Sequence, residues 1–571
     1  MKKSKKITLR TGLAGLFILL TAITPVVAAE DSATQPALAN QLARHPSPYL
    51  ALHGEDPVAW QEWGPEVLQR ARSENKLILL SSGYFSCHWC HVMQRESYQD
   101  ADIAERLNEY FIPVKIDREL EPALDKRLMA YAQATLKRGG WPLNVFMSPD
   151  GLPVYAVLYQ PAEPFMALLQ RLIPVWQEQS SRIRELALEE REPIRFPDSE
   201  PQIDPERARA LQRLAVEAIM STGDDLQGGF GQSNKFPSVP QLLFLLQSLH
   251  DSRNPEVIAF LQLTLDAMAD YGMRDQLGDG FYRYVVDPAW EIPHFEKMLY
   301  DNANLALLYL EAGLLLDKPN YTQIARSTLD FMVREMANDE GALYASFSAV
   351  DNHDVEGGYY LWKTQQLKSV LETEEYRLVS TYWQTERPHE LEGGNHFRAA
   401  MPLSELAEVL GIGETKAREQ LEAARRKLIA ERDKRVLPTD DKLIAGWNGL
   451  ALSAFSEAAR LLHDDSYRDQ AEKIRNFLVN NLWDGSNLQR SQAAGRLLGS
   501  ASLEDYAYVS RGLFDYARLS GQETNYVQAE QVLAQGWSRF HKHNAWSYAD
   551  ASLLPPAEGK EILSEAVSYT H

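Results

Sequence analysis

The chain of 571 residues has only two cysteines, and they lie in the segment Ser86-Cys87-His88-Trp89-Cys90-His91. A Cys-x-x-Cys pair between an apolar run and a helix is the usual setting of thiol–disulfide chemistry. A helix N-terminus favours negative charge, and protonated histidines at 88 and 91 would add to this effect. We therefore predict that Cys87 is the attacking thiolate and Cys90 the resolving thiol, with His88 and Trp89 as further site residues.

The same residues also match Cys-x-x-Cys-His, the attachment pattern of c-type haem. A structural disulfide and half of a zinc site are two further interpretations of the pair. The choice among these depends on the elements that surround the two cysteines.

Those elements follow the order of the thioredoxin fold. The patterns predict, in order, a helix over 65–75, a strand over 76–82, the Cys-x-x-Cys helix to 95, a helix from 100, a strand over 112–117, a helix over 123–136, a hairpin of strands over 143–147 and 152–158, and a helix over 165–186. A c-type haem domain needs none of this order and does need a second axial ligand, so the redox interpretation is favoured.

Pro142 stands at the start of the first hairpin strand, where thioredoxins place a cis proline that faces the disulfide. We therefore predict that the Trp141–Pro142 bond is cis, because X–Pro bonds adopt this form at modest cost. Its predicted role is to dock the backbone that carries the partner's cysteine. A trans proline at the start of an edge strand is the alternative.

Residues 1–29 have a basic start, an apolar centre and a small-residue exit at Val27-Ala28-Ala29. This pattern predicts a secretory signal peptide cut between Ala29 and Glu30, hence a periplasmic or secreted protein. An uncleaved anchor is the alternative, but no later stretch approaches the length of a membrane span. We expect no stable span after cleavage.

The charge composition argues against nucleic acids as partners. Residues 1–29 hold five of the 58 basic residues and none of the 79 acidic ones, so the mature chain carries a net charge of −26. Such an acidic protein is a poor nucleic-acid binder. An exported chain with only two cysteines fits a redox-active pair better than a disulfide scaffold.

The remaining chain divides into further segments. We predict a linker over 30–40, a thioredoxin-like domain over 41–192, a Pro-, Asp- and Glu-rich linker over 193–205, and a helical domain over 206–571. Paired helices joined by glycine- and aromatic-rich loops predict a solenoid that closes into an α/α toroid.

Several separated blocks resemble the thioredoxin-domain family DUF255, which includes spermatogenesis-associated protein 20 and the bacterial YyaL-type proteins. The main blocks are 47–50, 86–93, 115–119, 139–143, 228–231, 275–284, 293–302 and 447–449. The resemblance implies a multidomain chain: an α/β thioredoxin-like domain, then an all-α (α/α)6 toroid similar to six-hairpin glycosidases and N-acylglucosamine 2-epimerases. The family continues beyond this point, so we expect a toroid truncated at its C-terminus, an exposed apolar seam and non-native residues after about Ala566.

One departure from ordinary thioredoxins concerns proton transfer. They carry a buried aspartate six residues before the first cysteine, where this chain has Ser81. A general base must therefore come from elsewhere, with His88 and His91 as candidates, or be absent.

The loops of the helical domain hold candidate binding and acid–base residues. These are Asp279, His294, Glu296, Asp301, Asp351, Asp441, Trp447, Asn448, Asp505 and Tyr506. Paired carboxylates serve glycoside hydrolysis, and histidine serves proton abstraction in epimerases. The structural alternatives are a satisfied interior histidine, packing at 447–449, and capping by Asp440 and Asp441 of a helix that starts at Lys442.

The leading hypothesis is an exported thiol–disulfide oxidoreductase whose toroid recognises a partner. The expected partners are protein thiols and disulfides, with a saccharide as a second candidate, and no metal or cofactor is predicted. The alternatives are a carbohydrate-active enzyme with an accessory thioredoxin domain and a non-catalytic binding protein, because fold analogy alone does not establish function.

Overall fold

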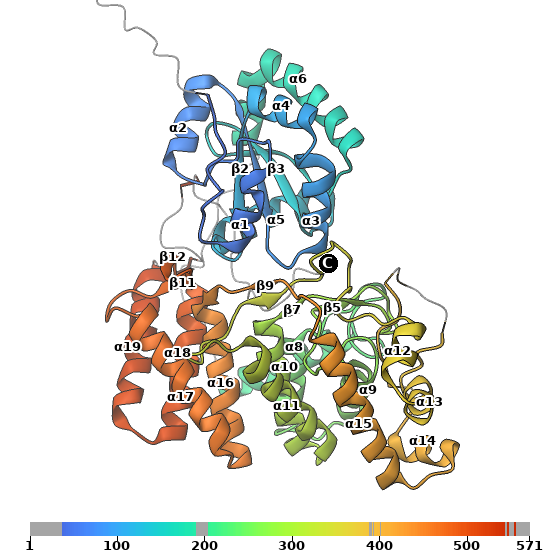
Figure 1. Cartoon of the computed structure of the whole chain (residues 1–571). Coiled ribbons are helices and arrows are strands. Elements are labelled where there is room, and N and C mark those ends of the chain that lie inside the picture. Colours follow the sequence, from blue (N-terminus) through green and yellow to red (C-terminus); the bar gives the residue numbers. More distant parts are fainter. Residues whose placement is uncertain are drawn as a thin grey trace, which may run out of the picture. The chain divides into compact units, whose positions relative to one another are not determined.

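A computed structural model of the chain describes residues 37–189, 204–387, 391, 393–399, 401–542, 545–547 and 553–554 (Figure 1). The predicted signal peptide, most of both predicted linkers and the residues beyond 554 lie outside the described residues. The described residues from Ala39 onward form one compact unit.

A four-stranded sheet forms the centre of the first part of this unit. Its strand order is β2-β1-β3-β4, in which β1 and β2 are parallel and the other pairs are antiparallel. The strands are β1 (Leu77–Gly83), β2 (Phe111–Asp117), β3 (Leu143–Met147) and β4 (Pro153–Val157). Every residue of β1, β2 and β3 is buried, as expected for strands that are covered on both faces.

Helices flank this sheet in the predicted order (Figure 1). They are α1 (Pro48–Leu52), α2 (Pro65–Glu74), α3 (His88–Met93), α4 (Ala101–Tyr110), α5 (Pro122–Leu136) and α6 (Ala162–Glu189). Local sequence sets their ends: Pro65 opens α2, left-handed Asn75 closes it, and the Asp100 side chain accepts a hydrogen bond from the Ile103 amide at the start of α4. The thioredoxin-like order predicted from the sequence is confirmed.

The second part is built from helix pairs. Helices α8, α10, α16 and α18 pack against one another in succession, and each is followed by a helix that packs back on it. The helices are α7 (Pro205–Met220), α8 (Val239–Ser248), α9 (Pro255–Asp270), α10 (Leu299–Leu315), α11 (Pro319–Phe331), α16 (Ala445–Leu462), α17 (Asp465–Phe477), α18 (Leu503–Ser520) and α19 (Glu523–Phe540). Helices α10 and α16 are buried on nearly every side, as the inner helices of an α/α toroid are.

Four helices between α11 and α16 form a cluster with its own core, in which the rings of Trp383 and Phe397 stack 4.6 Å apart. They are α12 (Thr364–Val370), α13 (Thr373–Tyr382), α14 (Leu403–Leu410) and α15 (Glu414–Arg432). Helices α13 and α14 were not predicted from the sequence.

Short strands pair with one another and so connect the loops at one end of the inner helices. One sheet joins β7 (Lys297–Met298), β8 (Ser346–Phe347) and β9 (Thr439–Asp440). Other short strands are β5 (Tyr284–Val285), β6 (Pro293–His294), β10 (Leu443–Ile444), β11 (Gln489–Ala493), β12 (Arg496–Ser500), β13 (His541–Lys542) and β14 (Ala545–Trp546). The proposed helix start at Lys442 was wrong, because β10 comes first and α16 begins at Ala445.

None of the helices in the described ranges combines the length and apolar character that a bilayer crossing needs. On α19 the side chains of Val527, Leu533 and Trp537 are 43%, 54% and 53% exposed.

Candidate functional site

Cys87 and Cys90 are joined by a disulfide at the start of α3. Cys87 is the N-cap of this helix, and its sulfur accepts a hydrogen bond of 3.2 Å from the Cys90 amide. The two cysteines are 3% and 1% exposed, whereas Trp89 between them is 45% exposed. Amide hydrogens directed at the Cys87 sulfur would stabilise its thiolate after reduction.

The two histidines beside the pair do not supply the positive charge that the sequence suggested. Burial is the main cause that lowers the pKa of both His88 and His91, so each is largely neutral near pH 7. The His91 Nε2 lies 2.7 Å from the Phe85 carbonyl oxygen. Haem attachment would need both sulfurs and this nitrogen, and all three atoms are engaged in protein contacts.

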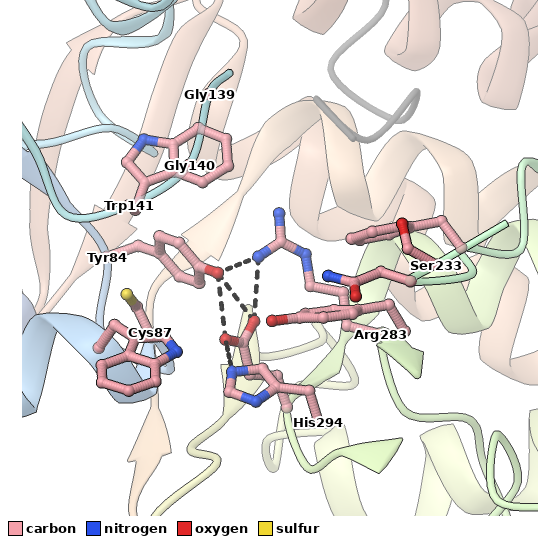
Figure 2. Close-up of a pocket in the computed structure, with 13 residues that line it drawn as sticks. Tyr84, Cys87, Gly139, Gly140, Trp141, Ser233, Arg283 and His294 are labelled. Atoms are coloured by element: carbon pink, nitrogen blue, oxygen red, sulfur yellow. Dashed lines mark hydrogen bonds and ion pairs between the residues drawn. The ribbon is translucent and has the colours of Figure 1, made fainter. Parts of the chain in front are cut away.

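The Trp141–Pro142 bond is cis, as predicted. Gly139, Gly140 and Trp141 before it line a cavity of about 320 Å³ together with Cys87 (Figure 2). The segment that leads into the proline and Cys87 thus lie around the same space.

The opposite wall of this cavity comes from loops of the toroid. Figure 2 shows Ser233, Arg283 and His294 across from Tyr84 and Cys87. The lining residues from these loops are Ser233, Asn234, Phe236, Arg283, Tyr284, His294 and Glu296.

Glu296 is the centre of a buried polar network on that wall. Its carboxylate accepts hydrogen bonds from the Tyr84 hydroxyl at 3.0 Å and from the Arg283 guanidinium at 3.1 Å. The guanidinium also contacts the Tyr84 hydroxyl. Burial would raise the pKa of Glu296, but Arg283 and His294 outweigh it and lower the pKa, so the carboxylate is ionised.

His294 lies between two carboxylates. Its Nε2 is 3.0 Å from Glu296 and its Nδ1 is 2.6 Å from Glu356. Burial lowers the pKa of His294, but the hydrogen bonds to the two carboxylates dominate and raise it to about 9. The ring is therefore an imidazolium at neutral pH.

Glu356 also lies 3.6 Å from the His88 Nε2, so polar contacts run from the Cys-x-x-Cys helix to the toroid wall. The sequence analysis did not select Tyr84, Arg283 or Glu356 as site residues. Arg283 lies in the block 275–284, which the family resemblance had already marked, and this was the available signal.

The structure places only His294 and Glu296, of the ten residues predicted in the helical domain, among those that line the cavity with Cys87. Three of the other carboxylates have structural partners or deep burial. Asp279 binds Arg274 at 2.8 Å and also Arg425, Asp505 binds Arg490 at 2.8 Å, and burial raises the pKa of Asp301 to about 8.

The remaining candidates do not line the cavity with Cys87 either. Asp351 accepts hydrogen bonds from the backbone amides of residues 353 and 355 within its own loop. Asn448 bonds both backbone groups of Leu343, Trp447 packs on Tyr300, and the Tyr506 hydroxyl accepts from the Leu488 amide. Asp441 is exposed at a separate cavity of about 400 Å³.

In the part of the chain that the structure describes, no group of three or more His, Cys, Asp or Glu side chains is arranged to hold a metal ion. Positively charged groups already balance the buried carboxylates near the cavity. The arrangement offers a thiol pair, a cavity and a network of hydrogen-bonding groups on its far wall.

Comparisons with known proteins identify relatives of the chain. The family described as "Protein of unknown function, DUF255" matches residues 39–193. Spermatogenesis-associated protein 20 of Homo sapiens is 32% identical over 557 residues, which cover 87% of this chain and 69% of the relative. The protein of the same name in Rattus norvegicus is 32% identical over 543 residues, covering 86% of this chain and 68% of the relative.

Solved structures were also compared. A GH76 alpha-mannanase of Bacteroides thetaiotaomicron aligns with a TM-score of 0.36 at 12% identity, over 58% of this chain and 72% of that chain. A sugar epimerase from a ruminal bacterium aligns with a TM-score of 0.30 at 13% identity, over 62% of this chain and 93% of that chain.

Proposed function

The chain belongs to the family of spermatogenesis-associated protein 20, and from the site described above we propose that it catalyses thiol–disulfide exchange at Cys87 and Cys90. The observation that carries this proposal is that Cys87 and the segment 139–141 line one cavity. A cysteine at a helix N-terminus beside a space for a partner has what the exchange requires.

The exchange has two balanced steps. The Cys87 thiolate attacks one sulfur of a partner disulfide, forms a mixed disulfide and releases the other sulfur as a thiolate. The Cys90 sulfur then attacks Cys87, which closes the Cys87–Cys90 disulfide and releases the second partner thiolate. Two electrons pass to the partner, a dithiol reductant restores the cysteine pair, and the reverse sequence oxidises a partner dithiol.

We assign the toroid the role of binding the exchange partner. Its loops supply the wall opposite Cys87, with the ring of Phe236 stacked 4.4 Å from Tyr284 and the charged Arg283, Glu296 and His294 beside them. A cavity of about 320 Å³ accommodates a small disulfide or a short extended peptide better than the flat surface of a folded protein.

Saccharide chemistry in this cavity has less support. Glycoside hydrolysis uses two carboxylates across the scissile bond, and Glu296 is the single carboxylate among the described residues that line the cavity. An epimerase base must accept a proton, whereas His294, with a pKa of about 9, already carries one at neutral pH. A bound saccharide as part of the exchange partner stays compatible with the site.

The test is to trap the mixed disulfide. In Cys90→Ser the resolving thiol is absent, so oxidised glutathione should leave a stable adduct on Cys87 that intact-mass spectrometry detects. Wild type should lose the adduct and close its own disulfide. Cys87→Ser is the matched control and should form little adduct, because Cys87 lines the cavity and Cys90 does not.

Probe size tests the role of the toroid wall. Hydroxyethyl disulfide should react with Cys90→Ser faster than insulin does. The additional substitution Phe236→Ala removes one aromatic ring from the wall. It should reduce the difference between the reaction rates of hydroxyethyl disulfide and insulin. A Cys pair that forms no reversible disulfide at any glutathione ratio would rule out the proposed function.

A further inference from the structure

In the second step of the proposed exchange, Cys90 attacks the mixed disulfide and resolves it. For this step the deeply buried Cys90 thiol must lose its proton. Ser81 stands at the position of the thioredoxin aspartate. The His91 Nε2 is already hydrogen-bonded to the Phe85 carbonyl oxygen. Burial in apolar surroundings disfavours a thiolate unless a donor or a positive charge lies near it. The groups behind Cys90 therefore decide how readily this step occurs.

Within the described part of the chain, the Tyr49 hydroxyl is a hydrogen-bond donor without a partner in the surroundings of Cys90. Its side chain is 1% exposed, and its hydroxyl has no hydrogen-bond partner among the described residues while the disulfide is closed. A methyl group built on Gly83 would lie less than 3.0 Å from both the Tyr49 hydroxyl and the Cys90 sulfur. The two atoms are thus close neighbours across Gly83, and a side chain at 83 would separate them.

Lys115 supplies a buried amine near the ring of Tyr49. Its Nζ is 3.1 Å from the Ser81 Oγ and lies 5.4 Å from the ring centroid of Tyr49. No carboxylate in the described ranges lies within 4.0 Å of it. Burial lowers the pKa of Lys115 to about 7, so its amine and ammonium forms are both populated near neutral pH.

Other titratable groups face this site from neighbouring elements. A neighbouring carboxylate, Asp56, is held by the His53 Nδ1 at 2.6 Å and by the Trp60 indole at 2.9 Å. The further titratable groups around Tyr49, Lys115 and His53 are Tyr98, Asp117, Asp125 and His91. Because Asp56 already has close partners, Lys115 is free to respond to a change of charge at Cys90.

We propose that Tyr49 and Lys115 form the site that stabilises the Cys90 thiolate during resolution. The Tyr49 hydroxyl donates a hydrogen bond to the Cys90 sulfur once the disulfide opens, and the Lys115 amine takes up the proton that Cys90 loses. The bond from Cys90 to Cys87 then forms as the bond from Cys87 to the partner breaks, and the partner leaves as a thiolate. This inference rests on the proposed exchange function.

The direct test is a titration of Cys90 alone. Cys87→Ala leaves Cys90 as the single cysteine, so the ultraviolet absorbance of its thiolate against pH gives its pKa. In this background Lys115→Met should raise the pKa of Cys90 by about one unit or more, and Tyr49→Phe should raise it by about half a unit to one unit. The matched controls Tyr155→Phe and Lys416→Met, at exposed positions, should leave it unchanged.

A second measurement uses the chain with both cysteines. Tyr49→Phe deletes a hydroxyl that lacks a partner in the disulfide form, so it should fold and should shift the equilibrium with glutathione towards the disulfide by about five- to tenfold. The pH at which resolution reaches half its maximal rate should rise with the pKa of Cys90. If Lys115→Met does not fold, Tyr49→Phe decides the question.

The two proposals fail in different ways. An unchanged Cys90 pKa and an unchanged glutathione equilibrium in folded Tyr49→Phe, with normal mixed-disulfide formation at Cys87, would overturn only the role of Tyr49 and Lys115. Absence of any exchange in wild type would instead remove the function on which this inference rests.

Discussion

At the scale of single residues, the positive charge of the His294 ring determines what this residue can do. An imidazolium 3.0 Å from Glu296 and 2.6 Å from Glu356 neutralises carboxylates that burial would otherwise penalise. It acts as a donor that holds both side chains in place. The same charge prevents it from acting as a general base near pH 7, which removes the main support for an epimerase-like reaction.

This role predicts the result of His294→Leu. Loss of the cation leaves Glu296 and Glu356 poorly compensated, so the free energy of unfolding at pH 7 should fall by about 3 kcal/mol. Urea denaturation measures this change, and His353→Leu at an exposed position is the matched control. An unchanged urea midpoint would contradict the assigned role.

The pH dependence of the same variant has a definite sign. The pKa of His294 rises from 6.5 to about 9 on folding, so its stabilisation is complete below about pH 6.5 and is lost as the pH rises through about 9. The difference in stability between wild type and His294→Leu should therefore shrink across this window. A difference that stays constant would show that the histidine stabilises by packing alone.

The sequence revealed part of the site at this scale. Cys87, Cys90 and Pro142 were predictable because their chemistry depends on local spacing. Tyr84 meets Glu296 and Tyr49 approaches Cys90 only through long-range folding, and local patterns do not encode such pairs. His294 and Glu296 were selected within a longer set whose other members serve the fold.

At the scale of elements, the start of α18 shows how an acidic residue that resembles a catalytic candidate can be structural. The Asp505 carboxylate accepts a hydrogen bond of 2.7 Å from the Ser502 amide and completes a capping box. It also binds the buried Arg490 at 2.8 Å and the Gly446 amide at 3.1 Å. One side chain thus joins the ends of α16 and α18 to β11.

Asp505→Asn should therefore change stability and leave exchange at Cys87 intact. It removes the charge that pairs with Arg490, so the free energy of unfolding should fall by about 3 kcal/mol. Asp441→Asn is the matched control, because Asp441 is exposed and should change stability by less than about 0.5 kcal/mol. Thermal unfolding and adduct formation at Cys87 check both variants, and loss of exchange in a stably folded Asp505→Asn would contradict a structural role.

Prediction of the elements succeeded where patterns are long and apolar. The runs that became β1, β2 and β3 are buried along their whole length, and their bounds were predicted to within one residue. Strand β11 was missed because Gln489, Arg490, Ser491 and Gln492 are polar, and their burial depends on pairing with β10 and β12. Helix α13 was missed because only two of its residues, Leu378 and Val379, are buried.

At the scale of the whole molecule, a charged cluster joins β2 to the loop before α16. The Lys442 ammonium, fully buried, lies 2.8 Å from Asp117, 3.0 Å from Glu119 and 2.6 Å from Asp440. One positive charge cannot balance three carboxylates. Burial, reinforced by Asp440 and Asp117 and opposed by Lys442, raises the pKa of Glu119 to about 8.

The attachment of the thioredoxin-like sheet to the toroid should therefore weaken as the pH rises from about 4.5 to about 8. Because the pKa of Glu119 rises from 4.5 to about 8 on folding, its contribution is complete below about pH 4.5 and is lost as the pH rises through 8. Other groups titrate in the same range, and Lys115, whose pKa is lowered, acts in the opposite direction. Glu119→Gln isolates the effect, because glutamine imitates the protonated acid at every pH.

The variant and wild type should have similar urea midpoints near pH 4.5, and at pH 6.5 the variant should already be the more stable, because Glu119 is then protonated in the folded protein and ionised in the unfolded chain. Between pH 6.5 and pH 9 wild type should lose about 2 kcal/mol relative to Glu119→Gln, since each pH unit below the folded pKa costs about 1.4 kcal/mol. Glu121→Gln, two residues further along the chain, provides a neighbouring carboxylate for comparison, and burial raises its pKa as well. Parallel stability curves for wild type and Glu119→Gln would mean that Glu119 stays ionised and that Lys442 balances all three carboxylates.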